Sequence, residues 1–146
     1  MSGSQGEGHR GGCLCGAVRY EIAGRLRPAL VCHCRMCQQT HGAPAAYTAA
    51  QRTRVRLEEA HGLAWYASSG KARRGFCREC GASLFWEPAG GDYWAVACGT
   101  LEPPTGIALA GHIFVASKGD WYEITDGLPQ FAAGTGGQVP QAPSAV

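Results

Sequence analysis

The cysteines of this chain fall in a pattern that constrains both its fold and its chemistry. All but one of the eight lie in three short clusters, Cys13–Cys15, Cys32–Cys37 and Cys77–Cys80. Four sulfurs can close a tetrahedral zinc site, whereas three sulfurs leave one position open. These two arrangements are typical of structural and of catalytic zinc, respectively. The clusters therefore indicate metal binding, and their sizes suggest two different kinds of site.

The first and third clusters are pairs that complement each other. Sulfurs on one zinc lie about 3.7 Å apart, but residues i and i+2 of an extended strand are separated by about 6.5–7 Å. We therefore expect Cys13 and Cys15 in a turn. Cys77 and Cys80 have the spacing of a zinc knuckle. Because neither pair can fill a tetrahedral site alone, the two pairs together predict one closed site. The alternative is a pair of disulfides or buried free thiols.

The middle cluster places the thiols of Cys32, Cys34 and Cys37 close enough in sequence to reach one metal ion. Three thiolates outweigh the charge of Zn²⁺, so this metal would acidify bound water less than a zinc held by three histidines. It would still bind the thiolate of a small molecule. Cys98 is an alternative fourth ligand that would make this site structural as well. His33 is a weaker candidate, because a residue between two ligands in a tight turn usually points away.

Size and composition indicate one globular, cytoplasmic domain. The chain has 146 residues, of which 45% are hydrophobic, enough for a core of its own. Neither an apolar leader at the start nor a run of about 18 apolar residues is present, so we expect no secretion signal and no membrane span. In the cytosol, close-spaced cysteines bind metal more often than they form disulfides. The net charge of +2 is too small to argue for nucleic acid.

Short alternating or aromatic runs between turn residues predict a mainly antiparallel β fold. The strongest helix candidate is one short segment, 35–40. We expect a flexible lead over residues 1–11, one domain over 12–131 and a disordered tail over 132–146, where small residues and proline dominate. The predicted strands are Ala17–Ile22, Thr53–Glu58, Leu63–Ala67, Ser83–Glu87, Tyr93–Ala97 and His112–Ala116.

Basic residues form two groups whose role the sequence leaves open. Arg52, Arg54 and Arg56 would share one face of a strand, where they could bind an anionic ligand or form a solvated surface. A second group, Lys71, Arg73 and Arg74, precedes the third cysteine cluster and could steer an anionic thiol towards it.

Three further residues could have either a functional or a structural role. His112 is a candidate acid or base, although a hydrogen-bonded structural histidine is the more common outcome. Asp126, followed by glycine, predicts a turn. Unless it binds metal, Cys98 is expected to be a buried thiol on a strand.

The motifs resemble those of the glutathione-dependent formaldehyde-activating family, which also includes centromere protein V-type proteins. The resemblance rests on Gly12–Tyr20, Cys32–Cys37 and Phe76–Gly81, and extends to the segment from His112 to Phe131. It implies a β-tent of short antiparallel strands stapled by a zinc site. It also implies a division of the ligands: Cys13, Cys15, Cys77 and Cys80 for a structural zinc, and Cys32, Cys34 and Cys37 for a catalytic zinc.

The resemblance implies a carbon–sulfur lyase with two Zn²⁺ per chain. Its reaction adds glutathione to formaldehyde, giving S-hydroxymethylglutathione, and reverses that addition. The expected partner is therefore a small-molecule thiol, with the substrate sulfur in the open zinc position. The alternative is a non-catalytic zinc-binding β domain for a protein or a nucleic acid, as centromere-type relatives suggest. A third hypothesis is redox or metal sensing by the middle cluster.

Overall fold

A computed structural model of the chain describes residues 8–136. These residues divide into two compact units. The first unit comprises residues 8–27 and 48–105, and the second comprises residues 28–47 and 106–136. Residues 1–7 of the predicted lead and 137–146 of the predicted tail lie outside the described part. No helix among residues 8–136 is long and apolar enough to cross a membrane.

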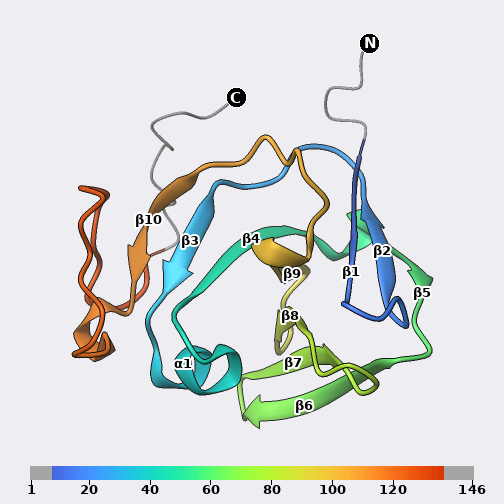
Figure 1. The fold of residues 1–146 in the computed structure, drawn as a ribbon, viewed down its shortest axis with the longest axis horizontal. Coiled ribbons are helices and arrows are strands. Elements are labelled where there is room, and N and C mark those ends of the chain that lie inside the picture. Colours follow the sequence, from blue (N-terminus) through green and yellow to red (C-terminus); the bar gives the residue numbers. More distant parts are fainter. Residues whose placement is uncertain (1–7, 137–146) are drawn as a thin grey trace. The chain divides into compact units, whose positions relative to one another are not determined.

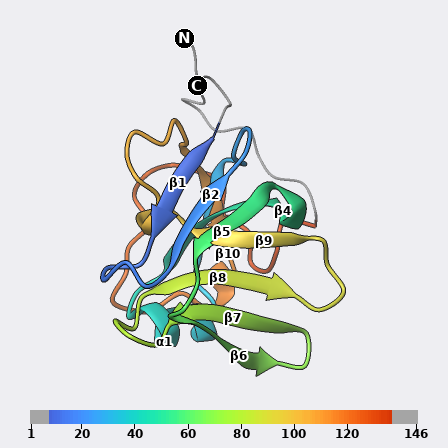
Figure 2. The ribbon, with the colours of Figure 1, turned by 90° about the vertical axis from the view of Figure 1, so that its right-hand side faces the viewer.

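A three-stranded antiparallel sheet forms one part of the first unit. Its order is β1 (His9–Gly12), β2 (Arg19–Ile22) and β5 (Val55–Glu59), and the three strands lie side by side in Figure 2. Along β2, Tyr20 and Ile22 are fully buried while the residues between and before them are not. The period-2 pattern that predicted this strand therefore places one face in the core. The predicted lead overlaps β1.

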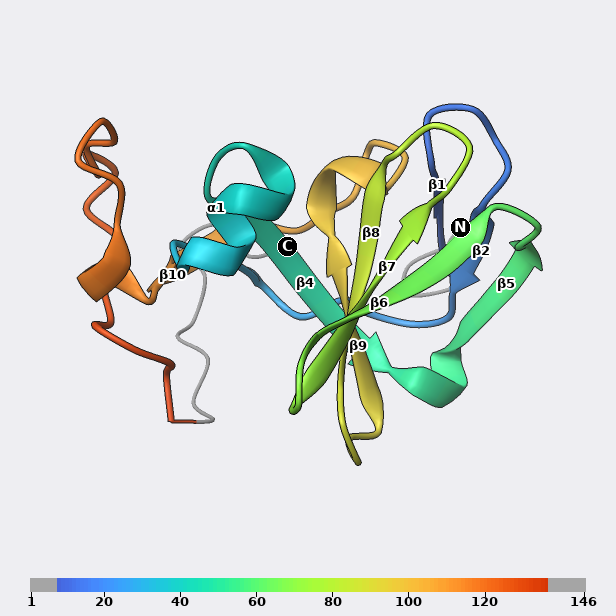
Figure 3. The same ribbon diagram turned by 90° about the horizontal axis from the view of Figure 1, so that it is seen from below.

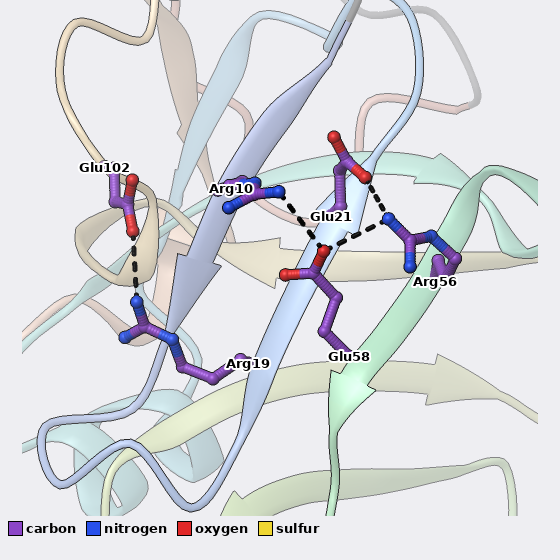
Figure 4. Close-up of polar contacts among 6 residues, drawn as sticks. All are labelled: Arg10, Arg19, Glu21, Arg56, Glu58 and Glu102. Atoms are coloured by element: carbon purple, nitrogen blue, oxygen red, sulfur yellow. Dashed lines mark hydrogen bonds and ion pairs between the residues drawn. The ribbon is translucent and has the colours of Figure 1, made fainter.

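Ion pairs connect the strands of this sheet on its exposed side (Figure 4). Glu58 lies 3.1 Å from Arg56 and 3.5 Å from Arg10. Arg56 also pairs with Glu21 of the neighbouring strand, and a separate pair joins Arg19 to Glu102. Exposed pairs of this kind contribute about 0–1 kcal/mol each. Their main effect is to match positive side chains with negative ones across the strands.

The rest of the first unit is a meander of antiparallel strands. Its members are β6 (Leu63–Ser69), β7 (Ala72–Cys77), β8 (Ser83–Pro88) and β9 (Tyr93–Ala97), hydrogen-bonded in the order β9-β8-β7-β6. Figures 2 and 3 show β6, β7 and β8 as neighbours. The end of strand β4 (Ala45–Gln51), residues 48–51, also belongs to this unit, and β4 neighbours β9.

Aromatic side chains fill the core of this unit. Phe85 is 1% exposed, and its ring lies 4.6 Å from that of Trp94 and 5.2 Å from that of Tyr20. Trp65 packs edge-on against Trp94 at 5.2 Å. The indole N–H of Trp94 donates to the carboxylate of Glu87 at 2.8 Å, which satisfies the one polar group that this ring buries.

The second unit contains β3 (Ala29–Cys32), α1 (Arg35–His41), the first residues of β4 (Ala45–Gln51) and β10 (Leu109–Ile113). β3 pairs antiparallel with β4 and parallel with β10, which lies beside it in Figure 1. The helix ends at Gly42, whose positive φ of 80° provides a left-handed cap.

The predicted fold class, a mainly β protein of short, chiefly antiparallel strands, is confirmed. The predicted helix is present and one residue longer. Two details of the prediction are wrong. Residues Arg52–Arg54 form a 3-10 turn, so β5 begins at Val55. The last strand spans Leu109–Ile113, and the chain then turns into a 3-10 segment, Val115–Ser117. The strands β1, β3, β4 and β7 were not predicted from the sequence.

Candidate metal centres

The first group of thiols consists of Cys13, Cys15, Cys77 and Cys80, whose sulfurs all lie within 4.8 Å of one another. The Sγ of Cys15 lies 3.8 Å from that of Cys13 and 3.8 Å from that of Cys77. These distances are close to the separation of about 3.7 Å expected between two sulfurs on one tetrahedral zinc. The two pairs that the sequence predicted to share a metal are therefore brought together within one unit.

Two turns place these sulfurs. Cys13 follows β1, and its N–H donates to the carbonyl of Val18 at 3.0 Å, which closes the turn into β2. Cys77 is the last residue of β7. The N–H of Gly81 donates back to the carbonyl of Cys77 at 2.7 Å, with Gly81 at a φ of 83°. A positive φ favours glycine at this position, which explains the residue that follows the knuckle.

Backbone N–H groups point at the sulfurs of this group. Val18 donates to the Sγ of Cys13 at 3.3 Å, and Glu79 donates to the Sγ of Cys77 at 3.4 Å. Backbone hydrogen bonds, above all from Ala82, lower the pKa of Cys80 to about 6. Such donors stabilise thiolates, which are the form that binds a metal.

Gly62 packs directly against the first group. A Cβ at this position would lie 2.9 Å from the Sγ of Cys77 and 2.6 Å from the Cβ of Ala17. The backbone of Gly62 also donates to the carbonyl of Ala17 at 3.0 Å and accepts from the N–H of Arg78 at 2.7 Å. Only glycine fits in this space while both hydrogen bonds are kept.

The second group of thiols consists of Cys32, Cys34 and Cys37, again with all sulfurs within 4.8 Å. Cys32 ends β3, Cys34 caps the N-terminus of α1, and Cys37 lies in the first turn of this helix. The Sγ of Cys34 accepts the N–H of Cys37 at 3.3 Å. A strand end and a helix start therefore bring three sulfurs to one place over six residues.

The electrostatics of the second group favour a cation. The thiols of Cys34 and Cys37, together with burial, raise the pKa of Cys32. Deprotonating several neighbouring thiols in a partly buried place is unfavourable, because the thiolates repel one another. A divalent metal ion offsets this repulsion. The donor set thus suits a thiophilic metal ion with three protein ligands.

His33, between two of these thiols in sequence, is fully buried. Its N–H donates to the carbonyl of Ile113 at 3.0 Å. Its carbonyl accepts the side-chain amide of Gln38 at 2.7 Å, and the same amide reaches the carbonyl of Ser117 at 2.9 Å. Helix α1 and the segment after β10 therefore hold the backbone of the Cys-His-Cys turn.

A hydrogen-bonded chain continues from the His33 side chain. Its Nε2 lies 2.9 Å from Nδ1 of His112, and Nε2 of His112 lies 2.8 Å from Oδ2 of Asp126. Asp126 starts a turn, as predicted, since its Oδ1 accepts the N–H of Leu128 at 3.0 Å. The contact between these residues was not predicted from the sequence. The only signal for it was a histidine placed between two ligands.

Cys98 lies in a 3-10 turn, Cys98–Thr100, directly after β9 and not on a strand. Burial raises the pKa of its thiol to about 11, while the charge of Arg27 and a backbone hydrogen bond from Thr48 oppose this shift. At neutral pH the thiol is therefore protonated. Within residues 8–136, the second group contains three cysteines, and Cys98 is not among them.

The predicted shared face of three arginines is wrong, because Arg52 and Arg54 lie in the 3-10 turn that precedes β5. The guanidinium of Arg52 lies 4.1 Å from the ring centre of Trp94. Arg54 donates to the carbonyls at positions 23 and 25. In the second basic group, Arg73 pairs with Glu87 at 2.5 Å and stacks over an indole ring. These contacts hold the arginines within the fold of the first unit.

The fold and the thiol groups define a class: a mainly β protein with a four-cysteine group and a three-cysteine group, each able to hold a metal ion. Residues 8–117 match the profile of the glutathione-dependent formaldehyde-activating enzyme family. The chain belongs to this family. The resemblance seen in the sequence motifs is therefore confirmed.

Two relatives agree with this assignment. An uncharacterized lyase of Schizosaccharomyces pombe is 26% identical over 125 residues, which cover 84% of this chain and 90% of the relative. A crystal structure of a Rhodobacter sphaeroides protein superposes with a TM-score of 0.58 at 26% identity. The match covers 70% of this chain and 98% of the Rhodobacter protein. The family and the lyase relative support a lyase-like enzyme.

Proposed function

We propose that this protein is a zinc-dependent carbon–sulfur lyase that acts on the adduct of a small thiol with an aldehyde, such as S-hydroxymethylglutathione. The observation that carries the proposal is the unequal pair of thiol groups, four sulfurs in one and three in the other. Family membership and the lyase relative support the same reaction class.

The two groups take different roles in this proposal. Cys13, Cys15, Cys77 and Cys80 hold a structural zinc, because four sulfurs complete its coordination. Cys32, Cys34 and Cys37 hold a catalytic zinc, because three ligands leave a position for substrate. Bound there, zinc supplies a Lewis acid that keeps a substrate sulfur in its thiolate form. In this proposal the chain carries two Zn²⁺, the number that the family resemblance implies.

In the addition direction, the sulfur of the thiol forms a bond to the aldehyde carbon. The carbonyl π bond breaks, its electrons move to oxygen, and a proton equivalent to the one lost from the thiol ends on that oxygen. The reverse reaction breaks the carbon–sulfur bond and returns the aldehyde and the thiol. The protein's part is to hold the reacting sulfur in a fixed place, which makes the addition effectively intramolecular. The protonated Cys98 takes no part in this scheme.

The proposed partner is a small-molecule thiol, glutathione or one of similar chemistry, and the proposed location is the cytoplasm, where such thiols stay reduced. The alternative function, a non-catalytic zinc domain that binds nucleic acid or protein, receives less support. Arg10, Arg19, Arg56 and Arg73 each pair with a glutamate. Each of these four guanidinium groups already has a carboxylate partner, with which a phosphate backbone would have to compete.

The test compares Cys34→Ser with Cys80→Ser in metal-loaded protein. A serine keeps the N-cap of α1, since its hydroxyl accepts the same N–H. Cys34→Ser should therefore abolish turnover of S-hydroxymethylglutathione while leaving the thermal midpoint nearly unchanged. Cys80→Ser should lower the midpoint and lose activity only as folded protein is lost. Cys98→Ser is the control and should keep both the wild-type turnover and the wild-type thermal midpoint. Equal behaviour of Cys34→Ser and Cys80→Ser would refute the division of roles.

A further inference from the structure

The series of hydrogen bonds from Asp126 through His112 to His33 ends at a ring nitrogen of His33 that has no hydrogen-bond partner among the described residues. His33 and His112 are 0% and 1% exposed. Nδ1 of His33 is buried and has no hydrogen-bond partner among the described residues. Nitrogen atoms of buried imidazoles are normally paired, so an orphan next to metal-binding cysteines requires an explanation.

The hydrogen bonds determine which nitrogen atoms carry protons. The carboxylate of Asp126 only accepts, so Nε2 of His112 carries a proton. With one proton on its ring, His112 accepts at Nδ1, and the hydrogen bond between the rings then comes from a proton on Nε2 of His33. Nδ1 of His33 is left as a bare lone pair.

The orientation of Asp126 is fixed as well. Its Oδ1 accepts the N–H of Leu128 at 3.0 Å, while its Oδ2 faces His112. A backbone N–H can only donate, so the side-chain atom of residue 126 that faces the N–H of Leu128 must be an acceptor. The turn 126–128 therefore holds the carboxylate in place, and the carboxylate sets both imidazoles.

We propose that Asp126 is a positioning residue for the second thiol group. Through His112 it holds His33 in the Nε2–H form, and this form fixes the turn that presents Cys32 and Cys34. The backbone of His33 is already tied to Ile113 and Gln38, so the imidazole adds a side-chain anchor to the same residue. The inference depends on the proposed function only for its effect on turnover.

The isosteric variant Asp126→Asn provides a sharp test. Its amide oxygen must face the N–H of Leu128, which leaves the NH₂ group facing His112. Nε2 of His112 then becomes an acceptor, its Nδ1 donates to Nε2 of His33, and His33 becomes the Nδ1–H form. Both tautomers reverse, and a buried N–H without a partner appears at His33.

The reversal should weaken metal binding by the second group. In the metal-free protein the turn can relax and allow the new N–H of His33 to reach water. Metal binding restores the turn and buries that N–H again. A buried donor without a partner corresponds to a loss of about 5- to 150-fold in affinity. The first group, which lies in the other unit, should keep its affinity.

The experiment uses full-length, zinc-loaded protein labelled with ¹⁵N in histidine. Two-bond ¹H–¹⁵N spectra identify the protonated nitrogen of each ring, and the variant His112→Gln assigns the His33 signals. Zinc affinity of each group is measured by competition with a chromophoric chelator. Asp120→Asn removes the same charge from an exposed position of the same unit and is the control.

We expect Nε2–H in both rings of the wild type, Nδ1–H in both rings of Asp126→Asn, and weaker zinc binding only at the second group. Asp126→Glu, which keeps a carboxylate, should restore the wild-type tautomers. A protonated Nδ1 at His33 in the wild type would overturn the proposal without any variant. Reversed tautomers in Asp126→Asn with unchanged zinc affinity at the second group would also overturn it. Because neither readout involves a substrate, an inactive protein would refute the lyase proposal and leave this one standing.

Discussion

The Sγ atoms of Cys15 and Cys77 lie 3.8 Å apart although 62 residues separate them in sequence. One belongs to the turn after β1 and the other ends β7. A metal between them therefore closes a long segment of chain, and closing a long loop removes conformational entropy from the unfolded state. This contact predicts that the first thiol group contributes chiefly to folding.

Removing the metal should strongly destabilise the first unit. Structural zinc in small domains contributes about 10–16 kcal/mol of apparent binding free energy at neutral pH. We therefore expect a strong chelator to lower the thermal midpoint by about 10 °C or more, measured by circular dichroism under reducing conditions. Re-addition of zinc should restore the midpoint. An unchanged midpoint after proven metal loss would show that this unit folds without a metal.

Gly62→Ala should disturb the first thiol group. The new Cβ would lie 2.9 Å from the Sγ of Cys77, closer than such atoms approach without a shift, so the sulfur or the β5–β6 turn must move. We expect overpacking to cost about 1–3 kcal/mol, measured by denaturant unfolding, together with weaker zinc binding.

Gly70→Ala is the matched control for this substitution. A Cβ at Gly70 meets nothing within 4 Å, and its φ is not in the left-handed region. The stability and the zinc content of Gly70→Ala should stay close to those of the wild type. If both variants lose metal equally, the close packing of Gly62 on Cys77 has no special role.

Phe85→Ala should remove the centre of the aromatic core. The ring of Phe85 contacts those of Tyr20 and Trp94 and is almost fully buried. Loss of such a side chain costs about 3–5 kcal/mol, which denaturant unfolding can measure. Tyr66→Ala, at a side chain that is 66% exposed in the same unit, should cost less than about 1 kcal/mol.

The thiol of Cys98 should react slowly at ordinary pH. Burial raises its pKa to about 11, whereas an ordinary cysteine has a pKa of about 8.5. Since the thiolate is the reactive form, alkylation of Cys98 in folded, metal-loaded protein should keep rising about tenfold per pH unit from pH 7 to 10. Peptide mass spectrometry after iodoacetamide treatment measures this rate.

Unfolded protein is the comparison for Cys98. In guanidinium chloride its alkylation rate should level off above about pH 9, as for a model thiol. A similar plateau in the folded protein would mean that its thiol is not held in a low-dielectric environment.

Local patterns in the sequence predicted the features that local patterns control. Alternation of apolar and polar residues predicted β2, and aromatic runs predicted β8 and β9. The strand β4 was missed because four of its seven residues, Ala-Ala-Tyr-Thr-Ala-Ala-Gln, are alanine, which is depleted in strands, and because apolar and polar residues do not alternate along it. Tertiary pairing decides its conformation. β3 was missed because it is short and mostly buried, without alternation.

The cysteine spacing predicted which thiols lie together in each group, because the spacing of metal ligands reflects the geometry around one ion. The hydrogen bonds that link Asp126, His112 and His33 could not be predicted from residue spacing. His33 and His112 are 79 residues apart, and they meet only because β3 and β10 pair side by side. Nothing in the residues near Asp126 or His112 indicates that pairing.

The cap of α1 also makes the second thiol group observable in solution. The N–H of Cys37 points at the Sγ of Cys34, so any change of charge on that sulfur alters the shielding of this amide proton. The amide resonance of Cys37 is therefore an intrinsic probe that needs no label on the metal and no chromophore. Titrations with metals or thiols can be followed at this single backbone position, independently of turnover.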